Sequence, residues 1–276
     1  QAIGQIHNEL WRDAMITLEI NDQIAHVRLN RPDKLNAMNW AFWSEMPGIV
    51  QTIDEDTNVR AVVLSGEGKA FTVGLDFFDM MPRLGRNGTQ ADGATQRHLH
   101  DLIRQMQWSV TCLERCRVPV IAAIHGYCLG GGIDLITACD IRFAAADAVF
   151  GIRETKMAIV ADIGTLQRLP RIVSDGIARE LVYTGRDFGA QYAKEIGLVN
   201  SVLDDHERTL DHALNVAKEI AANAPLAVEG SKHVLNHAIA GDVDRELEYV
   251  ATYNAAHLMS KDLGTAVEAF AMRKPP

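Results

Sequence analysis

One stretch of the chain, residues 125–162, constrains the fold more than any other, together with the strand that leads into it. That strand is an uninterrupted apolar run, residues 118–124, which is typical of a strand buried on both faces. His125 and Gly126 end it, and three consecutive glycines, 130–132, form a bend that only residues without side chains tolerate well. The segment of residues 133–139 is short and apolar, as expected for a buried helix. This order of elements predicts an α/β fold.

The glycine bend also predicts a chemical property. A glycine turn that opens a helix leaves unpaired backbone N–H groups at the positive end of the helix dipole. A second glycine turn, residues 73–76, follows another predicted buried strand, residues 60–65. Two such turns can direct two N–H donors at one oxygen, as the enolate of a thioester requires. A simple turn that lets a helix pack on a strand is the alternative interpretation of the bend.

Three carboxylates, Asp134, Glu154 and Asp162, lie in this otherwise apolar stretch. Each has a simple explanation when taken alone. Asp134 could be an early-helix acid favoured by the dipole, and Asp162 could be a helix N-cap. Glu154 could be surface charge beside Arg153. Because burying acids is costly, three of them beside two glycine turns favour an active site, in which His125 is expected to hold a turn.

The rest of the chain is predicted from its hydrophobic pattern. We expect a hairpin over residues 15–29, a helix over 39–54, a mobile loop over 82–96, and a long helix over 96–116. Helices are expected over 164–197, a short strand over 198–203, and helices alone over 205–273. A change of composition near residue 200 divides the chain into an α/β core, residues 1–200, and a helical region, residues 201–276.

Composition excludes several classes of protein. The chain has 276 residues, 47% of them hydrophobic, so it can bury a sizeable core. Its formal charge of −9 argues against nucleic-acid partners and anionic membrane surfaces. Four cysteines without CxxC spacing are expected to be reduced, buried thiols. With no membrane-length apolar run and no secretory pattern, a cytoplasmic protein is expected, although a processed organellar protein would look the same.

Five motifs carry a family resemblance. They are Asn30-Arg31-Pro32 with Asn36-Ala37-Met38, and residues 70–76, 125–134, 139–142 and 164–170. Together they resemble the enoyl-CoA hydratase/isomerase (crotonase) superfamily over roughly residues 16–271. The resemblance implies a crotonase-type spiral of ββα repeats with a helical C-terminal oligomerisation region, usually assembled as a hexamer of two trimers. It implies an acyl-CoA thioester as substrate, with coenzyme A as part of that substrate and no metal or other cofactor.

The resemblance also implies a binding site for the thioester. The backbone N–H groups of Leu75 and Gly131 form an oxyanion hole in the family, at the positions of the two glycine turns. The substrate is then expected along Gly131 and the segment Val73, Gly74, Leu75, Asp76 and Phe77. The nearby cations Arg31, Lys34 and Lys69 could meet the phosphates of coenzyme A or could be solvated turn residues.

The acids indicate the branch of the superfamily. Hydratases of the family carry Glu at the positions of Asp134 and Glu154 and a glycine-rich turn at the position of Asp162. The three acids of this chain instead resemble the dienoyl-CoA isomerase branch, which converts 3,5-dienoyl-CoA to 2,4-dienoyl-CoA in fatty-acid β-oxidation. The resemblance makes Asp162 the base at C2 and Glu154 the acid at C6, with Asp134 tuning Glu154. A hydratase, another crotonase-type lyase, or a non-catalytic acyl-CoA or RNA-binding member are the alternatives.

Overall fold

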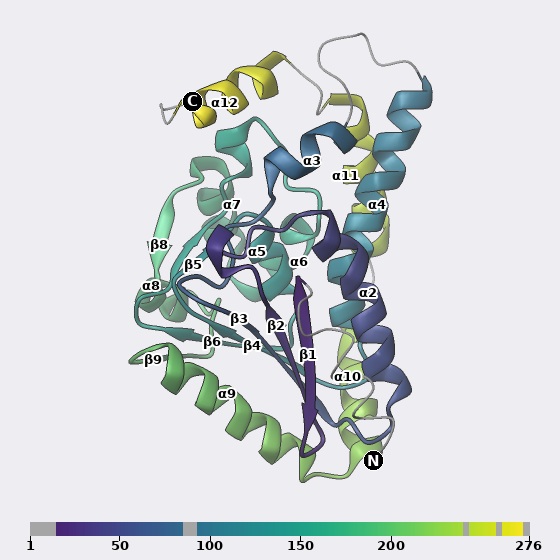
Figure 1. Ribbon diagram of the computed structural model, residues 1–276, viewed down its shortest axis with the longest axis vertical. Helices are drawn as coiled ribbons and strands as arrows, with labels where there is room; N and C mark the ends of the chain where they lie inside the picture. The colour runs from purple at the N-terminus through teal and green to yellow at the C-terminus, as the bar shows by residue number, and fades with distance from the viewer. Residues whose placement is uncertain (1–14, 85–92, 240–242, 258–260, 273–276) are drawn as a thin grey trace.

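The larger of two β-sheets runs through the middle of the fold (Figure 1) in the computed structural model, which describes residues 15–84, 93–239, 243–257 and 261–272. Within these residues it has six strands, in the order β1 (Ile16–Asn21), β2 (Ile24–Leu29), β3 (Ala61–Gly66), β4 (Val120–Ile124), β6 (Ile141–Ala145) and β9 (Ser201–Leu203). The predicted hairpin is confirmed as the antiparallel pair β1–β2, and every other neighbouring pair is parallel. The short strand predicted over 198–203 is β9.

The smaller sheet is formed by β5 (Tyr127–Leu129), β7 (Val149–Gly151) and β8 (Asp187–Gly189). The chain enters it twice in the same way. After β4 of the larger sheet come β5 of the smaller sheet and then helix α5 (Gly131–Thr137). After β6 come β7, the 3-10 helix η2 (Glu154–Met157) and helix α6 (Thr165–Ile172). The order strand, strand, helix is therefore repeated, as the family resemblance implied.

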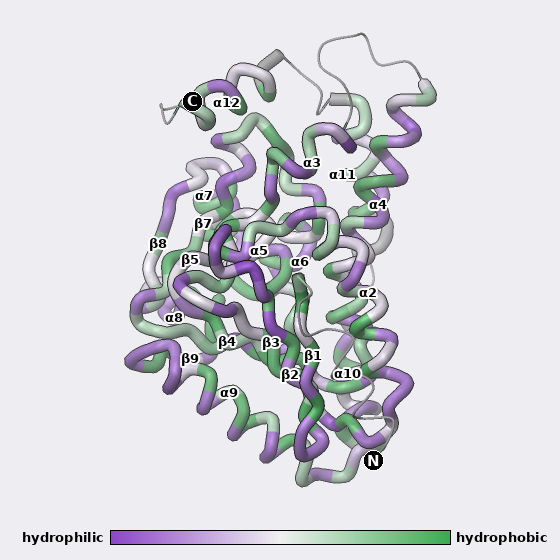
Figure 2. The backbone as a smooth tube through the Cα atoms, viewed as in Figure 1, coloured by the Kyte–Doolittle hydropathy of each residue, from purple (hydrophilic) through white to green (hydrophobic). Residues whose placement is uncertain are grey.

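The central strands are buried on both faces, which explains why they read as continuous apolar runs. Every residue of β3 and β4 is buried. On one face, Ala61 and Val63 of β3 pack against Ala213 and Ala217 of helix α9 (His206–Ala221). On the other face lies the main core. Figure 2 shows α9 alternating between hydrophilic and hydrophobic colours, as expected for a helix with one face on a sheet.

Long helices cover the other side of the larger sheet. Helix α2 (Trp40–Glu55) lies beside α4 (Gly93–Arg115) (Figure 1), and α11 (Val243–His257) also packs on α4. The prediction of a helix near 39–54 is confirmed, and the Asn39 side chain caps α2 by accepting from the Phe42 N–H at 3.3 Å. The long helix begins at Gly93, earlier than predicted. The remaining helices are η1 (Pro32–Lys34), α3 (Phe77–Leu84), α7 (Asp175–Thr184), α8 (Ala190–Glu195), α10 (Pro225–Ile239) and α12 (Lys261–Ala271).

The loop expected over residues 82–96 is wrong at both of its ends, because α3 continues to Leu84 and α4 begins at Gly93. Its middle, residues 85–92, lies outside the described residues. The region after residue 205 has helices and no strand wherever it is described, as predicted. None of the helices in the described ranges is long and apolar enough to span a membrane.

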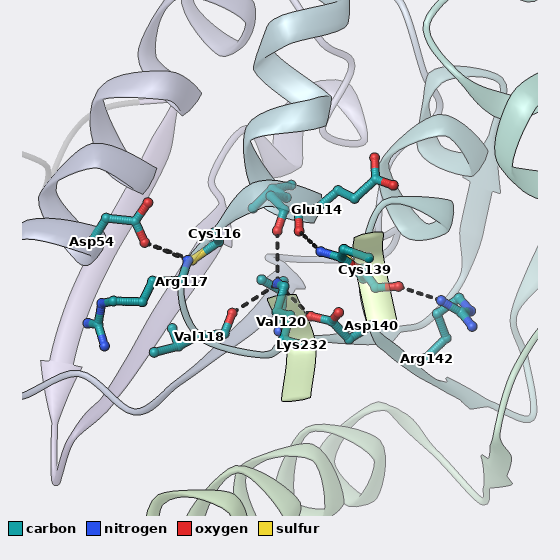
Figure 3. Close-up of polar contacts among 12 residues, drawn as sticks. Asp54, Glu114, Cys116, Arg117, Val118, Val120, Cys139, Asp140, Arg142 and Lys232 are labelled. Atoms are coloured by element: carbon teal, nitrogen blue, oxygen red, sulfur yellow. Dashed lines mark hydrogen bonds and ion pairs between the residues drawn. The ribbon is translucent and has the colours of Figure 1, made fainter. Parts of the chain in front are cut away.

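An ion pair between the buried Lys232 and the partly exposed Asp140 fastens α10 to the start of β4 (Figure 3). The Lys232 Nζ donates to Asp140 Oδ2 at 2.7 Å and to the Val118 carbonyl at 3.0 Å. It also donates to the Leu113 carbonyl at 3.3 Å. Asp140 Oδ2 accepts in addition from the Val120 N–H at 2.7 Å. The lysine thus has three acceptors, which compensates for the burial of its charge.

Candidate active site

The two glycine turns predicted from the sequence meet at the smaller sheet. The Thr72 N–H donates to the Tyr127 carbonyl at 2.9 Å, and the Thr72 carbonyl accepts from the Leu129 N–H at 3.1 Å. These bonds join the first turn to β5, which leads into the second. Gly74 has φ of +85°, and a Cβ there would lie 2.7 Å from the Leu129 carbonyl oxygen and 3.1 Å from the Gly131 nitrogen. A residue with a side chain therefore does not fit at Gly74.

Within the part of the chain that the structure describes, each turn leaves one backbone N–H group without a partner. The Met38 N–H donates to the Gly74 carbonyl at 2.8 Å, and the Met38 carbonyl accepts from the Asp76 N–H at 2.9 Å. In extended backbone, successive N–H groups point to opposite sides, so the N–H of Leu75 points away from Met38. Gly131 is the first residue of α5, where an N–H has no acceptor within the helix. Among the described residues no acceptor pairs with either group.

A cavity of about 820 Å³ adjoins both turns. Leu75, Gly131 and all three predicted acids line it. The larger part of its wall is apolar and includes Trp43, Phe78, Met106, Met157, Ile159 and Ile163. A mostly apolar cavity with a few converging polar groups is the usual form of a small-molecule site. In the described part of the chain, no group of three or more His, Cys, Asp or Glu side chains is placed to hold a metal ion.

Asp134 is the most deeply buried of the three acids, at 1% exposure. It lies in the first turn of α5, as an early-helix acid would. Its Oδ1 accepts from both the N–H and the hydroxyl of Thr165, at 2.6 and 2.7 Å. Burial raises the pKa of Asp134, while the Thr165 bonds and the charge of Arg168 lower it. The acid thus joins the start of α5 to the start of α6.

Asp162 precedes α6 but does not cap it. The helix begins at Thr165, and Gly164 occupies the N-cap position. The carboxyl group instead accepts from the Asn254 side-chain amide of α11, at 2.6 Å from Nδ2 to Oδ2. Burial raises the pKa of Asp162, the Asn254 bond lowers it and the charge of Asp134 raises it, and the net result is a pKa of about 7. The structure therefore removes the N-cap explanation for this residue.

Glu154 has little compensation for its burial. Its Oε1 lies close to Gly130, 3.5 Å from the point where a Cβ on that glycine would be. Its Oε2 is closed off from solvent and has no hydrogen-bond partner among the described residues. Burial, and after it the charges of Asp134 and Asp162, raise the pKa of Glu154 to about 8. Glu154 is not a surface charge, although the adjacent Arg153 does lie near the surface.

The basic residues are placed differently from one another. Arg31 pairs with Asp76, at 2.6 Å between Nη1 and Oδ2, so it holds the first turn. This makes Asp76, which also lines the cavity, part of an ion pair. Lys34 lines the cavity, whereas Lys69 is not among its lining residues in the described chain. Lys156, which the sequence analysis did not single out, also lines it.

Asn254, which holds the Asp162 carboxyl group, was not identified in the sequence analysis. Asn254 lies far along the chain from Asp162, in a region that was interpreted only as helices. One signal was available, because Leu247, Ala251 and Asn254 share the buried face of α11. A polar residue on an otherwise apolar helix face has to find a partner, but the sequence does not show which one.

Comparison with known proteins agrees with the family resemblance of the sequence. The family described as enoyl-CoA hydratase/isomerase matches residues 19–276. The mitochondrial Δ3,5-Δ2,4-dienoyl-CoA isomerase of Mus musculus is 44% identical over 252 residues, which cover 91% of this chain and 77% of the mouse protein. The peroxisomal enzyme of that name from Arabidopsis thaliana is 42% identical over 266 residues, covering 94% and 96% of the two chains.

A hydratase and a solved structure also resemble this chain. The short-chain-enoyl-CoA hydratase of Clostridium acetobutylicum is 34% identical over 256 residues, which cover 92% of this chain and 94% of that protein. The crystal structure of an enoyl-CoA hydratase/isomerase from Mycobacterium paratuberculosis has a TM-score of 0.81 and 30% identity. It covers 93% of this chain and 99% of its own, so the predicted fold class is confirmed over nearly the whole chain.

Proposed function

The chain belongs to the enoyl-CoA hydratase/isomerase family and has its crotonase-type α/β fold, and we propose that it is a dienoyl-CoA isomerase of fatty-acid β-oxidation. It would convert a 3,5-dienoyl-CoA into the 2,4-dienoyl-CoA. The observation that carries the proposal is the third acid, because Asp162 lines the same cavity as Asp134 and Glu154. The names of the Mus musculus and Arabidopsis thaliana relatives support it.

The thioester carbonyl is proposed to bind between the two glycine turns. The N–H groups of Leu75 and Gly131 would each lie about 2.7–3.1 Å from its oxygen and stabilise the negative charge that forms there by several kcal/mol. The acyl group would extend along the apolar wall past Val73 and Phe77. Lys34 and Lys156 also line the cavity and are the proposed contacts of the coenzyme A phosphates.

The proton transfers are assigned to Asp162 and Glu154, whose pKa values are raised to about 7 and about 8. The Asp162 carboxylate removes a proton from C2, and the electrons spread over a dienolate from the thioester oxygen to C6. The Glu154 carboxyl then gives its proton to C6, which leaves double bonds at C2 and C4. A base must be ionised and an acid protonated. The Asn254 hydrogen bond favours the ionised form of Asp162, whereas the Glu154 Oε2 has no partner among the described residues that would favour its ionised form. Asp134 holds the pKa of Glu154 up, and the reaction needs no metal or redox cofactor.

Hydration and isomerisation need different numbers of acids, so assays of the two reactions test the proposed function. Adding water across one double bond needs two acids that converge on one water molecule, and a third acid has no task there. The purified protein is expected to convert 3,5-dienoyl-CoA, followed by the rising absorbance of the conjugated 2,4-dienoyl product. Hydration of 2-enoyl-CoA without isomerisation would make it a hydratase. Inertness toward both thioesters would favour a binding protein.

The assembly is proposed to be a trimer or a hexamer of two trimers. Large apolar side chains are exposed on α10 and α11, among them Leu226 at 83%, Val234 at 64% and Tyr249 at 71%. Contiguous exposed apolar surface commonly marks a protein interface. Light scattering should give a multiple of three times the chain mass of 30.4 kDa, and a monomer at micromolar concentration would contradict this.

The cellular location stays a prediction. The Mus musculus relative is named mitochondrial and the Arabidopsis thaliana relative peroxisomal, so a cytoplasmic location does not follow from the comparison. The expected lack of nucleic-acid and membrane partners likewise stays a prediction that rests on the acidic composition, with a formal charge of −9.

A further inference from the structure

The carboxyl group of Asp162 is held by a side chain from the C-terminal part of the chain. Asn254 on α11 is buried, with 1% of its surface exposed. Its Nδ2 lies 2.6 Å from Asp162 Oδ2 and 2.7 Å from the Val160 carbonyl oxygen. A carbonyl oxygen only accepts hydrogen bonds, so the amide nitrogen must be the atom that faces both oxygens. Each of its two protons is then used, and the carboxylate is held in one orientation.

A second amide holds the main chain at the same residue. Gln107 on α4 is buried, and its Nε2 donates to the Asp162 carbonyl at 2.7 Å and to the Leu247 carbonyl of α11 at 3.0 Å. Gln107 therefore fixes the backbone of the loop, whereas Asn254 fixes the carboxylate. The two tasks are separated between two residues, so their effects can be separated by mutation.

The charges around Asp162 make the Asn254 hydrogen bond important for keeping the carboxyl ionised. Two acids, Asp134 on α5 and Glu154 on η2, interact with it electrostatically. From α6, the buried Arg168 donates to the adjacent Ile163 carbonyl at 3.3 Å and pairs with Glu114 at 2.8 Å. From α4 and α11 the charged side chains in this region, Arg104 and Glu248, pair with each other at 3.3 Å. Among the described residues, Asn254 is the side chain that donates to the carboxylate. Without this donor, burial and the neighbouring acids would favour the protonated form, which cannot accept a proton.

We propose that Asn254 is a positioning residue for the proton abstraction, which orients the Asp162 carboxylate and keeps it ionised. The inference rests on the proposed isomerase function. In the described chain Asn254 is not among the residues that line the cavity, so it acts through Asp162 and not on the substrate. It follows that the base is competent only while α11 is packed against the loop that carries it.

The test compares two variants with a matched control. Asn254→Leu removes the donor at similar size, and Asn254→Asp replaces it with an acceptor at the same size. Loss of one hydrogen bond to a charged group should move the acid limb of the kcat/KM profile up by about one pH unit. Exchange of the C2 proton with deuterated solvent at pH 7, close to the pKa of Asp162, should fall by about fivefold, with little change in KM. Asn236→Leu on α10, which removes an amide bond to the Glu114 carbonyl (2.8 Å), should leave the profile unchanged.

Two results would overturn the proposal. One is an acid limb that stays at the wild-type pH in both folded variants. The other is an equal loss of rate at every pH, as expected of a purely structural residue. Titration of ¹³C-labelled aspartate carboxyls in the ligand-free protein, with Asp162→Asn to assign the signal, measures the same shift without any turnover. It therefore separates failure of this inference from failure of the proposed isomerase function, which would appear as an inert wild type.

Discussion

Replacement of Glu154 by glutamine is expected to stabilise the fold while it abolishes turnover. Burial and two neighbouring acids raise the pKa of Glu154 from its ordinary value of 4.5 to about 8. Below pH 4.5 the carboxyl is protonated in both the folded and the unfolded chain, so it does not change the free energy of unfolding. Above pH 4.5 the unfolded chain ionises first, and stability is lost until the folded group also ionises near pH 8.

The size of this effect follows from the two pKa values. The interval from 4.5 to about 8 corresponds to about 5 kcal/mol of unfolding free energy above pH 8, and to about 3 kcal/mol at pH 7. Glutamine has nearly the same shape and does not ionise, so the variant escapes this loss. Its advantage over the wild type should therefore be small at pH 4.5 and largest above pH 8.

Denaturant unfolding at several pH values and one protein concentration measures this difference directly. The matched control is Glu195→Gln, because Glu195 is exposed at the end of α8. Its effect should be small and nearly independent of pH. If Glu154→Gln differed from the wild type by the same amount at pH 5 and at pH 9, burial of an acid at this position would not be the cause.

Four further results are expected. Asp162→Asn should lower both isomerisation and C2 proton exchange by about 10²–10⁴-fold, and full activity would place the base elsewhere. Gly74→Ala should lower kcat by about 10²–10³-fold, because its Cβ would displace the turn that carries one N–H donor; an unchanged kcat would contradict the oxyanion hole. Lys156→Met should raise KM for the coenzyme A thioester most at low salt, and an equal rise for a truncated pantetheine thioester would exclude phosphate contact. Lys232→Met should lower the unfolding free energy by about 1–3 kcal/mol in urea, because Asp140 loses its charged partner and the Leu113 and Val118 carbonyls lose a donor.

The parts of the fold that the sequence predicted are those with strong local signals. Strand β4 is a continuous apolar run because both of its faces are covered, and α2 begins at Asn39 because that side chain caps it. Strands β5, β7 and β8 have three residues each, too few for any alternation to be seen. Their pairing depends on contacts between distant segments, so the smaller sheet, which unites the two glycine turns, was not predicted.

The candidate site likewise has a part that could be predicted from the sequence and a part that could not. An acid in an apolar context is a local anomaly, which is why Asp134, Glu154 and Asp162 could be selected from the sequence. The donors that control these acids are ordinary residues at a distance. Thr165 is 31 positions from Asp134, and Asn254 is 92 positions from Asp162. Nothing in their local sequence distinguishes them from other buried polar residues, so only the fold reveals the pairs.

The hydrogen-bond donors around the three acids differ, and this difference supports the roles proposed for the acids. All three carboxyls have pKa values raised by burial, so burial alone does not assign roles. Asp134 accepts two hydrogen bonds from Thr165, and Asp162 accepts one from Asn254. The Glu154 Oε2 accepts none from the described residues. A carboxyl oxygen without a donor favours the protonated form, which agrees with the proposal that Glu154 gives a proton and Asp162 takes one. In this arrangement the direction of proton transfer depends on which neighbours donate to each acid.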